Sequence, residues 1–297
     1  MHIDGVFSGG GIKAFAFVGV YQVLEERHVI FKRVAGTSAG AIMAAFIIAG
    51  YKAKEIEELL DELDLSALLD ARKTLLPNPL MKWLNVYKYL GLYKGKALEK
   101  WFREKLSLKG IYTFADIPVG SLKIIASDLT NGKMLTIPDD LVNYGIHSND
   151  FSVAHALRMS CSIPYFFEPV TLKSERGEAI IVDGGVLSNF PLWTFDDEKR
   201  LRIRPVLGVK LSSRVEEQCP RKIDNGLNLF EALFSTMKNA HDQRYISRRH
   251  EKDILFIPTE EQSATAFGID HEEKQHLIQL GRERTERFLK HWPKVRL

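Results

Sequence analysis

Short apolar segments alternate along this chain with longer segments in which apolar residues recur every three or four positions. The short segments end in turns and predict strands at residues 2–7, 29–36, 121–129, 134–137, 177–185, 204–213 and 254–258. The longer segments predict helices at residues 13–27, 39–50, 53–70, 97–106, 151–160, 227–250 and 271–292. Because strands that alternate with helices favour a mainly parallel sheet covered on both faces, we expect a three-layer α/β/α fold.

Three local signals modify this alternation. The Asn131-Gly132 pair between two strand segments predicts an antiparallel hairpin. The acidic helix at 53–70 is expected to break near Ser66. The region around Pro164 and Pro169 is expected to be irregular, because proline removes a backbone donor.

The composition suits one globular domain. The chain has 297 residues, of which 45% are hydrophobic, so we expect a single domain over 1–297, with a core at about 3–212 and a helical C-terminal extension at 213–297. The two cysteines, Cys161 and Cys219, form neither a disulfide framework nor a zinc motif. We therefore expect no metal site and no cofactor.

The N-terminal sequence and the length of the apolar runs indicate where in the cell the protein is expected. The N-terminus lacks a basic region followed by an apolar one, and the longest apolar run, 41–50, is too short to span a bilayer. We expect a cytoplasmic protein that meets membranes at most at their surface. The net charge of +3 is mild and gives no reason to expect a nucleic-acid partner.

Charge is unevenly distributed along the chain. Residues 51–70 carry two Lys and seven Asp or Glu, whereas residues 71–110 carry ten Lys or Arg and only two Glu. The basic segment also contains the aromatic residues Trp83, Tyr87, Tyr89, Tyr93 and Trp101. Two interpretations stay open: a solvated basic helix face with aromatic residues in the core, or a surface at 73–96 that docks on anionic membranes or covers a site.

Ser38 stands between two glycines in the sequence Gly36-Thr37-Ser38-Ala39-Gly40, after a predicted strand and before a predicted helix. This is the context of the nucleophile elbow, in which a strained turn exposes the serine hydroxyl above the sheet. The glycines are needed because the chain approaches itself too closely for a Cβ, and the helix N-terminus favours developing negative charge. A serine that merely caps the helix is the alternative.

A second glycine turn, Gly9-Gly10-Gly11, also follows a strand and opens a helix that carries Lys13. Consecutive glycines allow backbone N–H groups to form an anion-binding nest, which an acyl-transfer enzyme uses as its oxyanion hole. Dinucleotide binding is the alternative, since the turn also fits G-x-G-x-x-G/A. That fold needs a carboxylate at the end of the second strand, and the segment 29–36 has none.

A third turn, Asp183-Gly184-Gly185, ends another apolar strand, and we expect all three turns on one rim of the sheet. By itself it is an ordinary Asp-Gly turn. Beside an elbow, Asp183 becomes a candidate base for Ser38, which works best in a dry site because the reference pKa of Asp is only about 3.9. A triad with histidine is the alternative, and the candidates, none of which follows a strand in a glycine turn, are His241, His250, His271, His276 and His291.

Together these motifs resemble the patatin-like phospholipase family. The matching stretches are SGGGIKA at 8–14, GTSAG at 36–40 and DGG at 183–185, and RMSCSIPYFFEPV at 158–170 is also similar. The chain departs from the usual pattern at Ala14, where the family has glycine, and at Gly185, where many members have alanine.

The resemblance implies a patatin-like three-layer fold and a lipid acyl hydrolase of the phospholipase A or lysophospholipase type. Its nucleophile would be Ser38, its base Asp183, and its oxyanion hole the backbone of Gly9, Gly10 and Gly11. Supporting roles would fall to Lys13, Gly36, Gly40, Gly184 and Gly185. The alternatives are a general carboxylesterase, a thioesterase or a neutral-lipid lipase that uses the same serine, and a non-enzymatic nucleotide-binding α/β protein.

Overall fold

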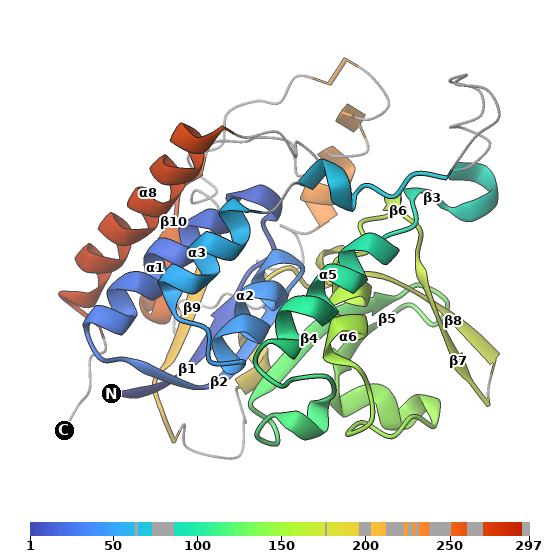
Figure 1. The fold of residues 1–297 in the computed structure, drawn as a ribbon, viewed down its shortest axis with the longest axis horizontal. Helices are drawn as coiled ribbons and strands as arrows, with labels where there is room; N and C mark the ends of the chain where they lie inside the picture. Colours follow the sequence, from blue (N-terminus) through green and yellow to red (C-terminus); the bar gives the residue numbers. More distant parts are fainter. Residues whose placement is uncertain are drawn as a thin grey trace.

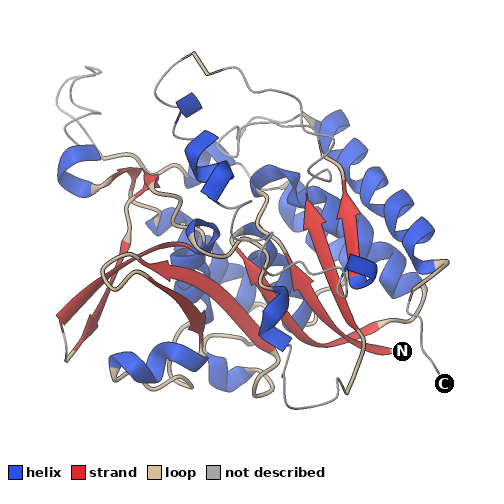
Figure 2. Cartoon of the chain, turned by 180° about the vertical axis from the view of Figure 1, so that it is seen from behind, coloured by secondary structure: helices blue, strands red, loops and turns tan. Residues whose placement is uncertain are grey.

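The central feature of the computed structural model is a mixed, mostly parallel β-sheet (Figures 1 and 2). The described residues are 1–62, 65–72, 86–175, 177–195, 203–211, 223–224, 228–229, 232–237, 251–259 and 270–292. Parallel pairing joins, in spatial order, β10 (Ile254–Ile257), β9 (Val206–Leu211), β1 (His2–Phe7), β2 (Ile30–Thr37) and β4 (Leu122–Asp128). Antiparallel pairing adds β5 (Lys133–Ile137), β8 (Gly177–Asp183) and β7 (Val170–Ser174).

Helices cover the sheet as the alternation of segments predicts. Figure 1 shows the long helices in front of the strands: α1 (Phe15–Glu26), α2 (Ala39–Ile48), α3 (Ala53–Asp61), α5 (Lys96–Ser107), α6 (Val153–Ser160) and α8 (His271–Leu289). The opposite face has its own apolar cluster, in which Val6 and Ala35 pack against Phe190 and the 3-10 helix η6 (Leu192–Phe195). The expected α/β fold, with a mostly parallel sheet flanked by helices, is confirmed.

The end of the chain packs against its beginning. A Cβ on Gly19 of α1 would lie 1.9 Å from the carbonyl oxygen of Ile278, and one on Gly281 of α8 would lie 2.0 Å from that of Ala16. Glycine at both positions therefore lets α1 and α8 touch through their backbones. Because β10 pairs with β9, the segment after residue 212 adds a strand to the sheet as well as a helix.

The pairing of β4 decides where two of the predicted turns meet. On one side of β4, β5 pairs with residues 124–128. On the other side, β2 runs parallel to β4 and ends with Thr37 opposite Ile125. On that same side β8 runs antiparallel and ends with Asp183 opposite Ala126. The carboxyl ends of β2 and β8 therefore face each other at consecutive positions of β4.

The prediction of an irregular region around Pro164 and Pro169 is wrong. Tyr165–Phe167 forms β6, which pairs in parallel with β3 (Gly91–Tyr93), and β7 forms a hairpin with β8. Neither proline occupies an interior strand position. The hairpin at Asn131-Gly132 is confirmed by the antiparallel pairing of β4 with β5.

Several predicted features lie wholly or partly outside the described residues. The acidic helix ends at Asp61, and the 3-10 helix η2 (Leu65–Leu68) follows after a gap at 63–64. Most of the helix predicted at 227–250 and the part of the basic segment at 73–85 also lie outside them. Within the described ranges, no helix combines the length and the hydropathy needed to cross a membrane.

Candidate active site

Ser38 lies in a strained turn between β2 and α2. Its φ of 52° and ψ of −122° are far from those of a helix or a strand, and only 8% of the residue is exposed. The turn is tight: a Cβ on Gly36 would lie 2.3 Å from the carbonyl carbon of Gly40, and one on Gly40 would lie 2.3 Å from the carbonyl oxygen of Phe7. Only glycine fits at either position, as the elbow pattern requires.

Ser160, at the end of α6, holds this turn to the sheet. The backbone N–H of Ser38 donates to the Ser160 hydroxyl oxygen at 2.9 Å, and that hydroxyl donates to the carbonyl of Ile125 on β4 at 2.6 Å. Sequence analysis did not single out Ser160. The sequence gives little indication of this role, because serine is common at helix ends. The two hydrogen-bond partners of Ser160 are also 35 and 122 residues away along the chain.

Asp183 ends β8 and is 1% exposed. Its backbone N–H donates to the carbonyl of Ser162 at 2.8 Å, and its Oδ1 accepts the backbone N–H of Gly185 at 2.7 Å. A Cβ on Gly184 would lie 2.3 Å from the carbonyl oxygen of Ile125. The carboxyl group is thus held in orientation by the turn that follows it, and the turn is pressed against β4 where β2 ends.

The glycine turn after β1 is joined to the turn after β8. The N–H of Gly9 donates to the backbone carbonyl of Asn189 at 2.9 Å, and the Asn189 side-chain amide donates back to the Gly9 carbonyl at 3.4 Å. No acceptor within the described chain takes the N–H of Gly10 or of Gly11. Lys13 donates its backbone N–H to the carbonyl of Gly10 at 3.3 Å.

Cys161 lies beside both Ser38 and Asp183. Burial raises the pKa of its thiol, and the negative charge of Asp183 raises this pKa further, while a hydrogen bond with Ser38 and the charge of Arg158 act in the opposite direction. The group is therefore a neutral thiol at physiological pH and behaves as a small apolar side chain.

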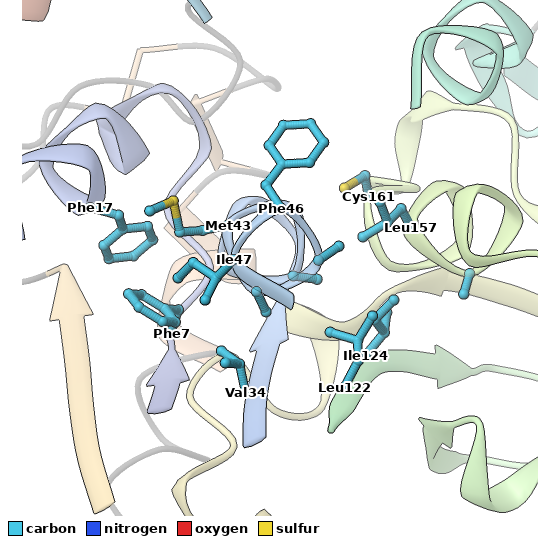
Figure 3. Close-up of a cluster of buried hydrophobic side chains, with 14 of the residues drawn as sticks. Phe7, Phe17, Val34, Met43, Phe46, Ile47, Leu122, Ile124, Leu157 and Cys161 are labelled. Carbon is cyan, nitrogen blue, oxygen red and sulfur yellow. The ribbon is translucent and has the colours of Figure 1, made fainter. Parts of the chain in front are cut away.

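An apolar cavity of about 140 Å³ opens from Ser38. Figure 3 looks along α2 and shows Phe46 and Cys161 on the side of this helix that faces away from Phe7 and Val34 of the sheet. The walls come from the glycine turn and η1 (Gly11–Ala14), from α2, and from Cys161, Ile163 and Phe167. The remaining lining residues are Phe15, Ile56, Leu60, Leu68, Leu69, Leu98, Trp101 and Phe102.

Polar contacts hold the segment that carries Leu68 and Leu69 over the cavity. The Asp70 carboxylate accepts the backbone N–H groups of Gly95, Lys96 and Ala97 at 2.6–3.1 Å, and so caps the N-terminus of α5. Two residues further on, the Arg72 guanidinium makes a two-pronged ion pair with Glu168 at 2.6 and 3.0 Å.

The structure brings the serine, the aspartate and the glycine turn together, and it places the described histidines elsewhere. His271, His276 and His291 are in or next to α8, which packs on α1, while His241 and His250 lie outside the described residues. His155 of α6 pairs with Glu99 at 3.2 Å. Across the described ranges, no group of three His, Cys, Asp or Glu side chains could hold a metal ion.

The structure is therefore that of an α/β protein in which a strained serine elbow and a glycine turn line an apolar cavity, with a buried aspartate close to the serine. The family model described as "Patatin-like phospholipase" matches residues 5–196. The chain belongs to this family, whose hydrolases are serine esterases and whose domain implies a lipid acyl hydrolase.

The chain is also similar to individual proteins. The chain is 54% identical to the uncharacterized protein YqhO of Bacillus subtilis, over 98% of this chain and 99% of that protein. It is 28% identical to a cUMP-AMP-activated phospholipase of Escherichia coli, over 62% of this chain and 54% of that one. The crystal structure of VipD from Legionella pneumophila superposes with a TM-score of 0.57 at 19% identity, covering 97% of this chain and 67% of VipD. The last similarity concerns the fold.

Proposed function

We propose that this protein hydrolyses fatty-acyl esters of phospholipids, with Ser38 as nucleophile and Asp183 as general base. The observation that carries the proposal is the meeting of β2 and β8 on β4, which brings a buried carboxylate close to the strained serine that lines an apolar cavity. An acyl chain is the natural occupant of such a cavity, because its walls offer almost nothing but apolar side chains.

The reaction follows from these positions. Asp183 accepts the hydroxyl proton as the Ser38 oxygen bonds to the ester carbonyl carbon. The negative charge that develops on the carbonyl oxygen is stabilised by the N–H groups of Gly10 and Gly11, since Gly9 already donates to Asn189. The C–O bond to the lysophospholipid then breaks, and the leaving oxygen takes the proton from Asp183.

Water completes the cycle. Asp183 removes a proton from a water molecule, whose oxygen attacks the acyl carbonyl, and the bond to Ser38 breaks with return of the proton to the serine oxygen. Fatty acid is released, and every group returns to its starting state. The acyl chain lies in the cavity and the headgroup lies outside it. The named activities of the relatives divide, since the E. coli relative is a phospholipase and a 28% identical relative from Schizosaccharomyces pombe is a triacylglycerol lipase. The description of the family favours a phospholipid.

A fluorophosphonate probe tests the nucleophile directly. The purified protein should form one adduct, which peptide mass spectrometry places on Ser38, and Ser38→Ala should form none while keeping its thermal unfolding temperature. Ser121→Ala is the matched control, because Ser121 is also buried but lies at the opposite end of β4. An adduct elsewhere, or full lipid hydrolysis by Ser38→Ala, would refute the proposal. Release of fatty acid from phosphatidylcholine, compared with triacylglycerol and acyl-CoA, identifies the ester.

A further inference from the structure

An exposed apolar patch lies at the end of the two-stranded sheet formed by β3 and β6. Its members are Tyr87, Leu90 and Tyr165, which are 85%, 47% and 55% exposed. Tyr87 lies in the helical turn at 86–89, and Leu90 follows it directly and donates its backbone N–H to the carbonyl of Val86. Gly91, the next residue, pairs with Tyr165 across the ladder. Figure 1 shows this turn beside β3 and β6, projecting from the body of the molecule.

The backbone at this patch is unusual for the residues that it carries. Leu90 has φ of 60° and Tyr165 has φ of 63°, in the left-handed region that favours glycine or asparagine. A large apolar side chain in this conformation adds strain, and at these two positions it adds little to the core. Strained backbone of this kind clusters at functional sites, and both side chains are about half exposed, so they are accessible to a contact outside the chain.

The charges around the patch indicate the kind of contact. Residues 86–96 contain Lys88, Lys94 and Lys96 and no Asp or Glu. The nearest carboxylate on β6–β7, that of Glu168, is neutralised by Arg72. Tyrosine rings with apolar bodies and polar tips, set among lysines, match the headgroup level of an anionic membrane.

The ladder also connects the patch to the cavity. Gly91 pairs with Tyr165 at the patch, and two residues further along Tyr93 pairs with Phe167, which lines the cavity. At about 3.3 Å per residue, the two positions are roughly 7 Å apart. A lipid surface that meets the patch is therefore next to the cavity wall.

We infer that Tyr87, Leu90 and Tyr165 form a docking surface for the anionic lipid–water interface, which delivers a phospholipid to the cavity beside β6. This inference rests on the proposed function for its purpose, but docking is measured without catalysis. The Ser38→Ala protein serves for binding, in co-sedimentation with phosphatidylcholine vesicles that do or do not contain phosphatidylglycerol.

The test variant is Tyr87→Gln with Leu90→Asn and Tyr165→Asn, because asparagine suits the positive φ at the last two positions. Binding to anionic vesicles should fall at least tenfold, and Lys88→Gln alone should weaken it about fivefold. The matched control, Leu108→Asn with Tyr112→Gln, removes apolar side chains elsewhere that are 70% and 57% exposed, and it should bind like the parent. In the Ser38 background, the test variant should hydrolyse a soluble short-chain ester at the parental rate.

Three outcomes would overturn the inference. The parent protein could fail to bind vesicles, or the test variant could bind them as well as the parent does. The parent could also be a dimer in solution while the test variant is a monomer, which would assign the patch to contact with a second copy of the chain. Failure of docking alone leaves Ser38 labelled by fluorophosphonate and soluble esters hydrolysed. Failure of the proposed function removes the labelling and leaves vesicle binding intact.

Discussion

Phe46 is expected to set the longest acyl chain that the cavity receives. Ala39, Ile42, Met43 and Phe46 line the cavity along one face of α2, which begins directly after Ser38. At 1.5 Å per residue, the distance from Ser38 to Phe46 along the helix is about 12 Å. An extended hydrocarbon advances about 1.25 Å per carbon, given C–C bonds of about 1.5 Å. The cavity therefore matches an acyl chain of roughly ten carbons.

The informative change is Phe46→Ala. The Phe46 ring is followed by the rings of Tyr51 and Trp101, whose centroids lie 5.3 and 5.8 Å from its own. Removing the ring opens about 4 Å more, which is room for roughly three further carbons. Because each buried methylene contributes about 0.8 kcal/mol, kcat/KM should rise about fourfold per carbon up to the end of the cavity. The optimum should therefore move from about ten carbons to about thirteen.

The assay is kcat/KM over a series of p-nitrophenyl esters from acetate to palmitate. The variant should lose about 3–5 kcal/mol of unfolding free energy, so its folded fraction is checked by thermal unfolding at the assay temperature. Phe17→Ala is the matched control, since Phe17 is equally buried but belongs to α1 and lies on the far side of Met43, away from the cavity (Figure 3). An unchanged optimum in folded Phe46→Ala protein, or the same shift in Phe17→Ala, would show that the acyl chain does not run along α2.

Three further predictions address the elbow, the base and the buried thiol. Gly40→Ala places a Cβ 2.3 Å from the carbonyl oxygen of Phe7, so denaturant unfolding should show a loss of about 1–3 kcal/mol or more and Ser38 should no longer react with fluorophosphonate. Asp183→Asn keeps an acceptor for the N–H of Gly185, so unfolding should change little while ester hydrolysis falls at least about a hundredfold; a smaller loss would point to another base. The raised pKa of Cys161 keeps its thiol neutral in the folded state, so as pH rises above about 8.5 ionisation of the unfolded chain should lower the unfolding free energy by up to about 1.4 kcal/mol per pH unit. Denaturant titrations of Cys161→Ala from pH 7 to 10 should lack this slope, and an identical slope in both proteins would contradict the assignment.

Much of the fold was predictable because its signals are local. Apolar periodicity distinguished the strands from the helices. Asn131-Gly132 marked the hairpin correctly, because the four-residue loop 129–132 needs a positive φ at Gly132, which glycine adopts without strain. The strands β3 and β6 were not predicted. Each is three residues long and pairs with a partner more than seventy residues away, so neither periodicity nor composition identifies it. Pro164 led to the wrong prediction of an irregular region, because proline is tolerated at the position just before a strand.

By itself the sequence determined the serine elbow, because only glycine fits at 36 and 40, where a Cβ would lie 2.3 Å from neighbouring backbone atoms. The sequence also marked Asp183 as a candidate base, but the structure places it near Ser38 for a different reason from the one expected. We expected the turns on one rim because the carboxyl ends of parallel strands share a rim, yet β8 is antiparallel to β4. Its end meets the end of β2 only because both strands pair with the same side of β4. Strand direction and register depend on long-range packing, and so only the tertiary structure decided that Ser38, Asp183, Cys161 and the cavity come together.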